Sequence, residues 1–196
     1  MSVREKIADL GLDFPQPPTP VGAYLPTVRT GNCIYTSGQL PTMDGRLLVA
    51  GKVPEEVDLG KGQAAAAMAV MNALAAIELE LDSLDDIRQI VRMNVYVNSS
   101  PGFTDQAAVA NGASELLVHA FGSPGRHTRC AVGVAELPLN APVELDLLVE
   151  VRGDGPRLPT MGAISAARKS PADAGGFNGS ECDCPAGGAP CWRRGL

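Results

Sequence analysis

Aromatic and basic side chains are scarce in this sequence of 196 residues. Aromatic residues make up 4% of it, too few for a platform on which single-stranded bases could stack. Sixteen lysines and arginines stand against twenty-two acidic residues, so the formal net charge is −6. A protein with this charge balance lacks the basic surface that binds phosphate backbones. The composition therefore argues against nucleic acid as a general partner.

Long apolar runs are also missing. The most apolar stretch, residues 64–76, is mostly alanine and is interrupted by Asn72, whereas a membrane-spanning helix needs roughly 20 strongly apolar residues. Four of the first ten residues are charged, in the region where an export signal would have its apolar segment. The five cysteines are an odd number without regular spacing, which favours reduced thiols. We therefore expect a cytoplasmic protein that has no membrane partner.

Motifs for metals and cofactors are absent or incomplete in the sequence. Two histidines, His119 and His127, cannot build a three-ligand zinc site without carboxylates at a suitable spacing. Cys182, Cys184 and Cys191 are one ligand short of a closed zinc site. The sequence also has no phosphate-binding Walker loop and no G-x-S-x-G nucleophile motif. We expect no metal site and no bound cofactor.

The composition changes after Arg152. Residues 1–152 hold the helix and strand patterns and carry a net charge of −7. Residues 153–196 contain nine glycines and five prolines in 44 positions, without sustained periodicity. Such a segment cannot bury enough apolar surface to offset the entropy lost on ordering it. We therefore predict one folded domain over residues 1–152 and a disordered tail over residues 153–196.

Hydrophobic periodicity predicts the elements of the folded domain. Ser2 can cap a short helix that ends near Gly11, and a proline-rich extended segment follows. Strands are predicted at residues 24–29, 32–37, 46–49, 88–98, 128–135 and 143–151, and long helices at residues 58–81 and 104–121. Clustered strands with two helices predict an α+β fold, in which both helices pack on one face of a mixed sheet.

The last two predicted strands carry the most informative side chains. We interpret them as a hairpin joined through Leu137 and Pro138. Alternation then places Arg129 and Glu144 on neighbouring strands, on the face that the helices leave uncovered. A planar guanidinium there suits the two-pronged binding of a carboxylate. The simpler interpretation is a cross-strand salt bridge between Arg129 and Glu144, and the pattern alone leaves both open.

Several different motifs are spread along the folded domain at linked spacings. A tyrosine precedes a Ser-Gly-Gln segment, an asparagine lies in the second long helix, and an arginine precedes Leu-Pro at a fixed spacing, with a glutamate six residues after the proline. The residues are Tyr24, Ser37, Gly38, Gln39, Asn111, Arg129, Leu137, Pro138 and Glu144. In these motifs, from about residue 17 to residue 152, the sequence resembles the Rid family, also called YjgF-like, which is known for RidA-type reactive intermediate imine deaminases.

The resemblance implies a chorismate-mutase-like fold assembled as a homotrimer, with ligand pockets in the clefts between subunits. By position, Arg129 corresponds to the arginine that binds the substrate carboxylate, and Glu144 to the glutamate that positions or activates water. Further pocket positions correspond to Tyr24, Ser37, Gly38, Asn111 and Ala131. An N-terminal extension and an unusual segment before the arginine, residues 125–128, mark this chain as a side branch of the family.

The activity that the resemblance implies is hydrolysis of 2-imino or 2-enamino acids to 2-keto acids and ammonia, as in a 2-iminobutanoate/2-iminopropanoate deaminase. An imine is already electrophilic, so no metal or organic cofactor is required. One alternative is a trimeric protein that binds small carboxylates, or regulates through them, without converting them. Another is an endoribonuclease, which the acidic charge disfavours.

A homotrimer is also expected from the predicted face pattern. Ala131, Gly133 and Ile90 are predicted on the uncovered face of the sheet. A single domain would leave this surface in contact with water, so we expect a second copy of the chain to cover it.

Overall fold

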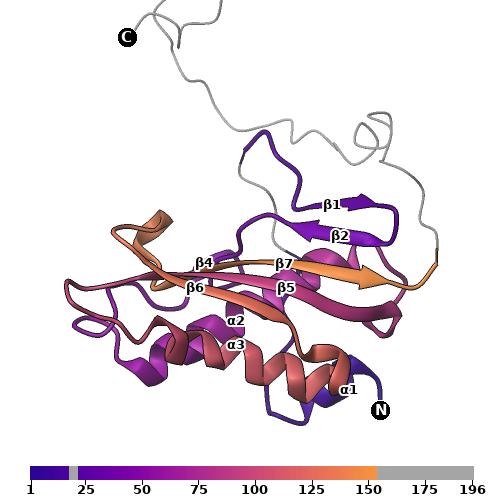
Figure 1. The fold of residues 1–196 in the computed structure, drawn as a ribbon, viewed down its shortest axis with the longest axis horizontal. Helices are drawn as coiled ribbons and strands as arrows, with labels where there is room; N and C mark the ends of the chain where they lie inside the picture. The colour runs from indigo at the N-terminus through magenta and orange to yellow at the C-terminus, as the bar shows by residue number, and fades with distance from the viewer. Residues whose placement is uncertain (18–21, 154–196) are drawn as a thin grey trace, which may run out of the picture. The chain divides into compact units, whose positions relative to one another are not determined.

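The computed structural model describes residues 1–17 and 22–153 (Figure 1). Its elements, in chain order, are α1 (Val3–Ala8), β1 (Thr27–Thr30), β2 (Cys33–Thr36), β3 (Thr42–Met43), β4 (Arg46–Leu47), α2 (Leu59–Glu78), η1 (Leu84–Asp86), β5 (Ile87–Asn98), α3 (Gln106–Phe121), η2 (Ser123–Gly125), β6 (Thr128–Val134), η3 (Pro138–Asn140) and β7 (Val143–Val151). Apart from Gly153, the predicted tail lies outside the described residues, and its boundary stays a prediction.

Five strands form the main sheet, in the order β1-β2-β7-β5-β6. All neighbours are antiparallel except β5 and β6, which run parallel. The helices α2 and α3 lie on the same side of this sheet (Figure 1). The predicted α+β fold, with a mixed sheet and its two long helices on one face, is confirmed.

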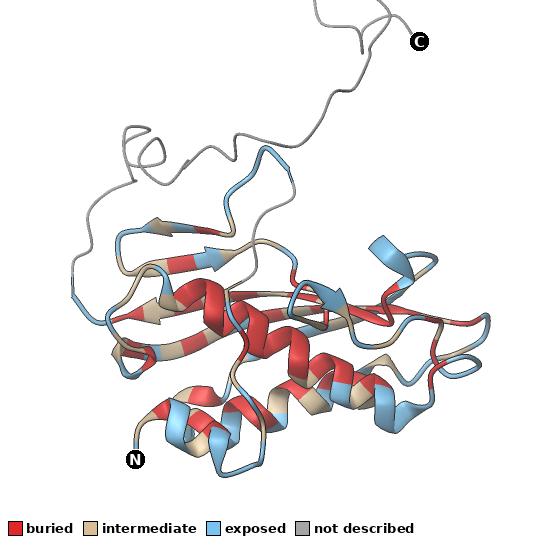
Figure 2. Ribbon diagram, turned by 180° about the vertical axis from the view of Figure 1, so that it is seen from behind, coloured by how far each residue is buried: buried red, intermediate tan, exposed pale blue. Residues whose placement is uncertain are grey.

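The helix α2 is the most buried element (Figure 2). Its N-terminus is capped by Asp58, whose carboxylate accepts a hydrogen bond from the backbone N–H of Lys61 at 2.9 Å. Small residues allow a very close approach to α3: a Cβ built on Gly112 would lie 2.6 Å from the carbonyl carbon of Gln63. The backbones of the two helices are therefore in contact, and this contact fixes the position of α3 relative to α2.

The central strands β7 and β5 form the sheet side of the core. Every second residue of β7 is buried, as the alternation predicts. In β5 the pairing register with β7 shifts between Ile90 and Arg92. Such a β-bulge inserts one residue and reverses the faces on one side of it. Ile90 is consequently fully buried, and its predicted place on the uncovered face is wrong.

The predicted hairpin of the last two strands is also wrong. β6 pairs with β5, in parallel, and β5 lies between β6 and β7. In this register Arg129 lies beside Met93, and Ala131 beside Val95, two residues that face the helices and are buried. Arg129, Ala131 and Gly133 therefore point toward the helix side, opposite to their predicted orientation.

The N-terminal part follows the prediction with shorter elements. Ser2 and Glu5 form a capping box at the start of α1, as the first residues predict. β1 begins at Thr27, three residues later than predicted. The predicted strand at residues 46–49 shrinks to β4, which pairs with β3, an unpredicted strand, in a separate two-stranded sheet.

Candidate functional site

Arg129 extends from the edge strand β6 over the helix α3, which supplies all of its described partners. Its Nη1 donates to Oδ1 of Asn111 at 2.8 Å and to Oγ of Ser114 at 3.0 Å, and its Nη2 donates to the carbonyl oxygen of Ala107 at 3.3 Å. Among the residues that the structure describes, these contacts use three of the five guanidinium N–H groups. The Nε–H and one Nη2–H make no hydrogen bond with the described residues. Two of the residues predicted for the pocket, Arg129 and Asn111, are therefore in contact within one chain.

Two members of this cluster, Ser114 and His127, were not predicted. Nε2 of His127 lies 3.2 Å from Oγ of Ser114, and Nδ1 lies 2.7 Å from the carbonyl oxygen of Gly125. The spacing of Asn111 and Ser114, three residues apart on one helix, is the signal that could have shown a shared polar face.

Glu144 lies on the other face of the sheet, at the start of β7. Its side chain is half-buried, and burial, followed by the nearby negative charge of Asp146, raises the pKa of its carboxyl above the usual range. Gly38 leaves the space that this carboxyl occupies, since a Cβ on Gly38 would overlap Oε1 and lie 2.9 Å from Cδ of Glu144. A carboxyl whose pKa is raised in this way is a candidate for a functional group.

Ser37 precedes Gly38 in the chain, and Tyr24 lines the same cavity as Gly38. The Ser37 hydroxyl donates to the carbonyl oxygen of Leu25 at 2.6 Å, and its backbone N–H donates to that of Pro26 at 2.8 Å. These bonds hold the segment that carries Tyr24, which is 49% exposed. Tyr24 and Gly38 both line a cavity of about 620 Å³, whose other walls include prolines and leucines. The structure thus brings Tyr24, Ser37, Gly38 and Glu144 to one end of the sheet.

The two clusters do not meet within one chain. Arg129 faces the helices, whereas Glu144 pairs with Tyr96 on the uncovered face, and β5 separates their strands. Two strand spacings alone amount to about 10 Å. No ion pair of Arg129 or Glu144 occurs among the described residues, so the simpler interpretation, a salt bridge between them, is wrong. Ala131, half-buried, lies on β6 with Arg129.

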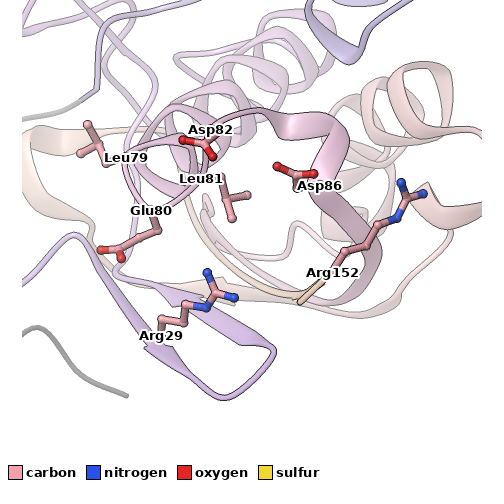
Figure 3. Close-up of a pocket in the computed structure, with 7 residues that line it drawn as sticks. All are labelled: Arg29, Leu79, Glu80, Leu81, Asp82, Asp86 and Arg152. Atoms are coloured by element: carbon pink, nitrogen blue, oxygen red, sulfur yellow. The ribbon is translucent and has the colours of Figure 1, made fainter. Parts of the chain in front are cut away.

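A second cavity, of about 340 Å³, lies beyond the C-terminal end of α2 (Figure 3). It contains none of the predicted site residues. Its two guanidiniums, of Arg29 and Arg152, lie on opposite sides of the view and do not meet (Figure 3). That of Arg29 already donates to the carbonyl oxygens of Gly31 and Gly153. The two arginines of this cavity therefore do not form a binding site for one ligand group.

Metal-binding and membrane-spanning features can be assessed over residues 1–17 and 22–153. Within these ranges no three His, Cys, Asp or Glu side chains come together as a metal site would require. Within the same ranges no helix has both the length and the apolar character needed to cross a bilayer.

Comparison with known families accounts for the fold and for the motifs. The sequence model of the family described as "YjgF/chorismate_mutase-like, putative endoribonuclease" matches residues 4–151. The chain belongs to the YjgF/chorismate-mutase-like family. This membership confirms the Rid resemblance, and the arrangement of this YjgF-like chain agrees with the solved structures of relatives.

Three relatives illustrate the similarity. Protein TCP17 of Trypanosoma cruzi is 41% identical over 150 residues, which are 76% of this chain and 94% of the relative. A 2-iminobutanoate/2-iminopropanoate deaminase of Dermatophagoides farinae is 32% identical over 142 residues, 71% of this chain and 94% of the relative. The solved structure of a protein of unknown function from Agrobacterium tumefaciens superposes with a TM-score of 0.72 at 40% sequence identity. The match covers 76% of this chain and 92% of the Agrobacterium chain.

Proposed function

We propose that this YjgF-like protein hydrolyses 2-imino or 2-enamino acids to 2-keto acids and ammonia. The observation that carries the proposal is the guanidinium of Arg129, which three contacts to α3 hold in place while two N–H groups stay available. A carboxylate accepts two such hydrogen bonds in parallel, and the charge makes them stronger than neutral ones. A small acid with one carboxylate matches this site better than a polyanion does.

Glu144 supplies the chemistry of the proposed reaction. Its carboxylate takes a proton from water as the water oxygen bonds to the imine carbon, and the C=N π electrons move to nitrogen. The carboxyl returns that proton to nitrogen, which gives an amino alcohol. The carboxylate then takes the hydroxyl proton and passes it to the amino nitrogen as the C–N bond breaks, so that a C=O bond forms and ammonia leaves. A raised pKa suits these transfers, because it makes the carboxylate a better base for taking the proton from water than an ordinary carboxylate is. An imine carbon is electrophilic, so the scheme calls for no cofactor.

The proposal includes assembly into a homotrimer. Arg129 and Glu144 lie on opposite faces of one sheet, so a pocket that uses both takes Arg129 from one copy and Glu144 from another. The uncovered face exposes large apolar side chains on three strands: Val28, Tyr35 and Val132. A face of this kind is suited to contact with another copy of the chain.

The similarity to a named deaminase supports the activity, since that relative is 32% identical and covers 71% of this chain. The family description also mentions an endoribonuclease. The net charge of −6 speaks against RNA as the substrate, because binding phosphate backbones relies on basic side chains.

A non-catalytic carboxylate-binding or regulatory protein is the second candidate. The contacts that hold Arg129 exist within one chain and do not involve Glu144. Such a site can bind a small carboxylate without any chemical step, and a binding protein would use the same arginine.

The cytoplasmic location remains a prediction from the sequence.

The decisive experiment measures keto-acid release from freshly generated 2-iminopropanoate. The wild type should accelerate release, and Glu144→Gln should lower the rate by about 10²–10⁴ while retaining affinity for 2-ketobutyrate. Arg129→Lys keeps the charge but loses the planar fork, so its affinity for 2-ketobutyrate should fall about tenfold. Arg126→Lys, in an exposed arginine of the same segment, is the matched control and should change neither quantity.

Two results would contradict these assignments. Release at the uncatalysed rate, with 2-ketobutyrate still bound, would leave only the binding candidate. Equal affinity of wild type and Arg129→Lys in calorimetric titrations would show that Arg129 does not bind the carboxylate.

A further inference from the structure

A chain of hydrogen bonds runs from Arg129 into the turn before β6. A carbonyl oxygen only accepts, so the 2.7 Å contact with Gly125 places a proton on Nδ1 of His127. In the neutral ring Nε2 is then an acceptor, and the Ser114 hydroxyl donates to it at 3.2 Å. The oxygen of that hydroxyl accepts from Nη1 of Arg129 at 3.0 Å. Every donor and acceptor in the series is therefore consistent.

Close packing holds the histidine in this place. Gly125 is buried, and a Cβ there would lie 2.7 Å from the carbonyl carbon of Leu117 in α3. The turn is closed by two backbone hydrogen bonds, from Gly125 to Gly122 at 3.0 Å and from Arg126 to Ser123 at 3.1 Å. The carbonyl that orients the His127 ring thus belongs to a turn fixed directly against the helix that carries Ser114.

We propose that His127, acting through Ser114, is a positioning residue for Arg129. The carboxylate-binding site then includes His127 and Ser114 in addition to Arg129. The inference rests on the proposed carboxylate-binding role of Arg129. A serine hydroxyl rotates freely unless a partner fixes its single proton. Because His127 accepts that proton, the lone pairs of Ser114 face Arg129. The guanidinium is held in one orientation, with its remaining N–H groups toward the ligand.

A Ser–His pair can also serve as a nucleophile and its base. The contacts of Ser114 argue against this role. Arg129 donates to the serine oxygen, which withdraws electron density from the atom that would attack. Ser114 also lies within α3 and is half-buried. A positioning role is therefore the better account of the same three side chains.

Variants of the two residues separate positioning from general stability. His127→Phe preserves the ring shape but removes the acceptor, so KM and the Kd for 2-ketobutyrate should rise about five- to tenfold, with kcat changed less than about threefold. His127→Gln offers an amide oxygen to the Ser114 hydroxyl and should restore part of the affinity. His119→Phe is the matched control, since His119 lies on the helix that carries Ser114 but contacts the carbonyl oxygen of Lys6 instead.

A double variant tests whether His127 acts through the serine. Ser114→Ala should weaken binding as much as His127→Phe does, and combining the two should cost no more than Ser114→Ala alone. Additive losses would overturn the proposal, and so would a His127→Phe variant with unchanged Kd. Cleavage of p-nitrophenyl acetate that disappears in Ser114→Ala would establish the nucleophile role instead.

A measurement on the ligand-free protein keeps this test independent of the proposed function. Long-range ¹H–¹⁵N NMR should show the His127 ring protonated at Nδ1, and the Nε–H of Arg129 should exchange with water faster in His127→Phe than in the wild type. A ring protonated at Nε2 alone, or an unchanged exchange rate, would overturn the positioning role. If the wild type binds no 2-ketobutyrate and hydrolyses no imine, the proposed function fails, while these two signals still decide the role of His127.

Discussion

The carboxyl of Glu144 has its pKa raised first by burial and then by the charge of Asp146. Asp146→Asn removes that negative charge, so the pKa of Glu144 should fall toward the usual range of a carboxyl. If Glu144 acts as the base, the rate falls as pH drops through its pKa. The acidic limb of the kcat/KM profile should therefore move to lower pH in Asp146→Asn.

The substitution keeps an acceptor oxygen for the other neighbours of Asp146, which are Asn94 and Tyr96. Asp146 accepts a hydrogen bond from Asn94 at 2.8 Å, and an asparagine oxygen can accept the same bond. A pH–rate series on both proteins checks the shift. An acidic limb that stays in place, or moves to higher pH, would show that a group other than Glu144 controls it.

The close approach at Gly38 provides a second test of Glu144. A Cβ at this position would overlap the end of a flexible side chain rather than backbone, so Gly38→Ala should move the carboxyl with little effect on folding. We expect at least a tenfold loss of kcat and a change of about 0.5 kcal/mol or less in the free energy of unfolding. Gly60→Ala, whose Cβ would meet only Asp58 Oδ1 at 3.4 Å, should retain full activity. Activity comparable to wild type in Gly38→Ala would separate Glu144 from the reaction.

Residue types and family motifs predicted Arg129 and Asn111 as parts of one site, and the structure joins them by a hydrogen bond. Ser114 and His127 were not predicted, because a serine on a helix and a histidine after a turn are both common. Their relation depends on the turn after α3, which brings together side chains thirteen residues apart.

At the scale of elements, periodicity predicted where the strands and helices lie but failed at the pairing of β6. Two strands separated by eight residues favour a hairpin, yet α3 carries the chain across so that β6 lies parallel to β5. In the sequence, apolar Cys130, Val132 and Val134 predict a core face. In the structure it is Gly133 that faces the helix side, where a Cβ would lie 2.9 Å from Ser99 Oγ. On an edge strand with apolar residues on the outer face, alternation cannot tell core from surface.

The contact between the long helices is testable at the same scale. Gly112→Ala would force α2 and α3 apart, because the added Cβ meets the backbone of Gln63. Overpacking of this kind should lower the free energy of unfolding by about 1–3 kcal/mol, as measured by chemical denaturation. Gly60→Ala, in the first turn of α2, should instead be neutral or stabilise by up to about 1 kcal/mol. Equal stability of wild type and Gly112→Ala would contradict the backbone contact.

For the whole molecule, the uncovered face of the sheet determines how copies should associate. We expect a mass near three times 20.3 kDa by light scattering. Val132, 41% exposed on that face, and Val118, 38% exposed on α3, form a matched pair. A charge placed in an apolar interface is costly, so Val132→Lys should lower the mass to that of a monomer, while Val118→Lys should not. A trimer in both variants would place the interface elsewhere.

The placement of Arg129 and Glu144 on opposite faces of one sheet has a genetic consequence. A chain with Arg129→Ala and a chain with Glu144→Ala should each be inactive, yet every mixed cyclic trimer contains one interface where an intact arginine meets an intact glutamate. Random mixing of equal amounts should therefore recover about a quarter of wild-type activity. A cell carrying the two defective alleles would then keep partial function through complementation between them, whereas sites contained in single chains would recover none.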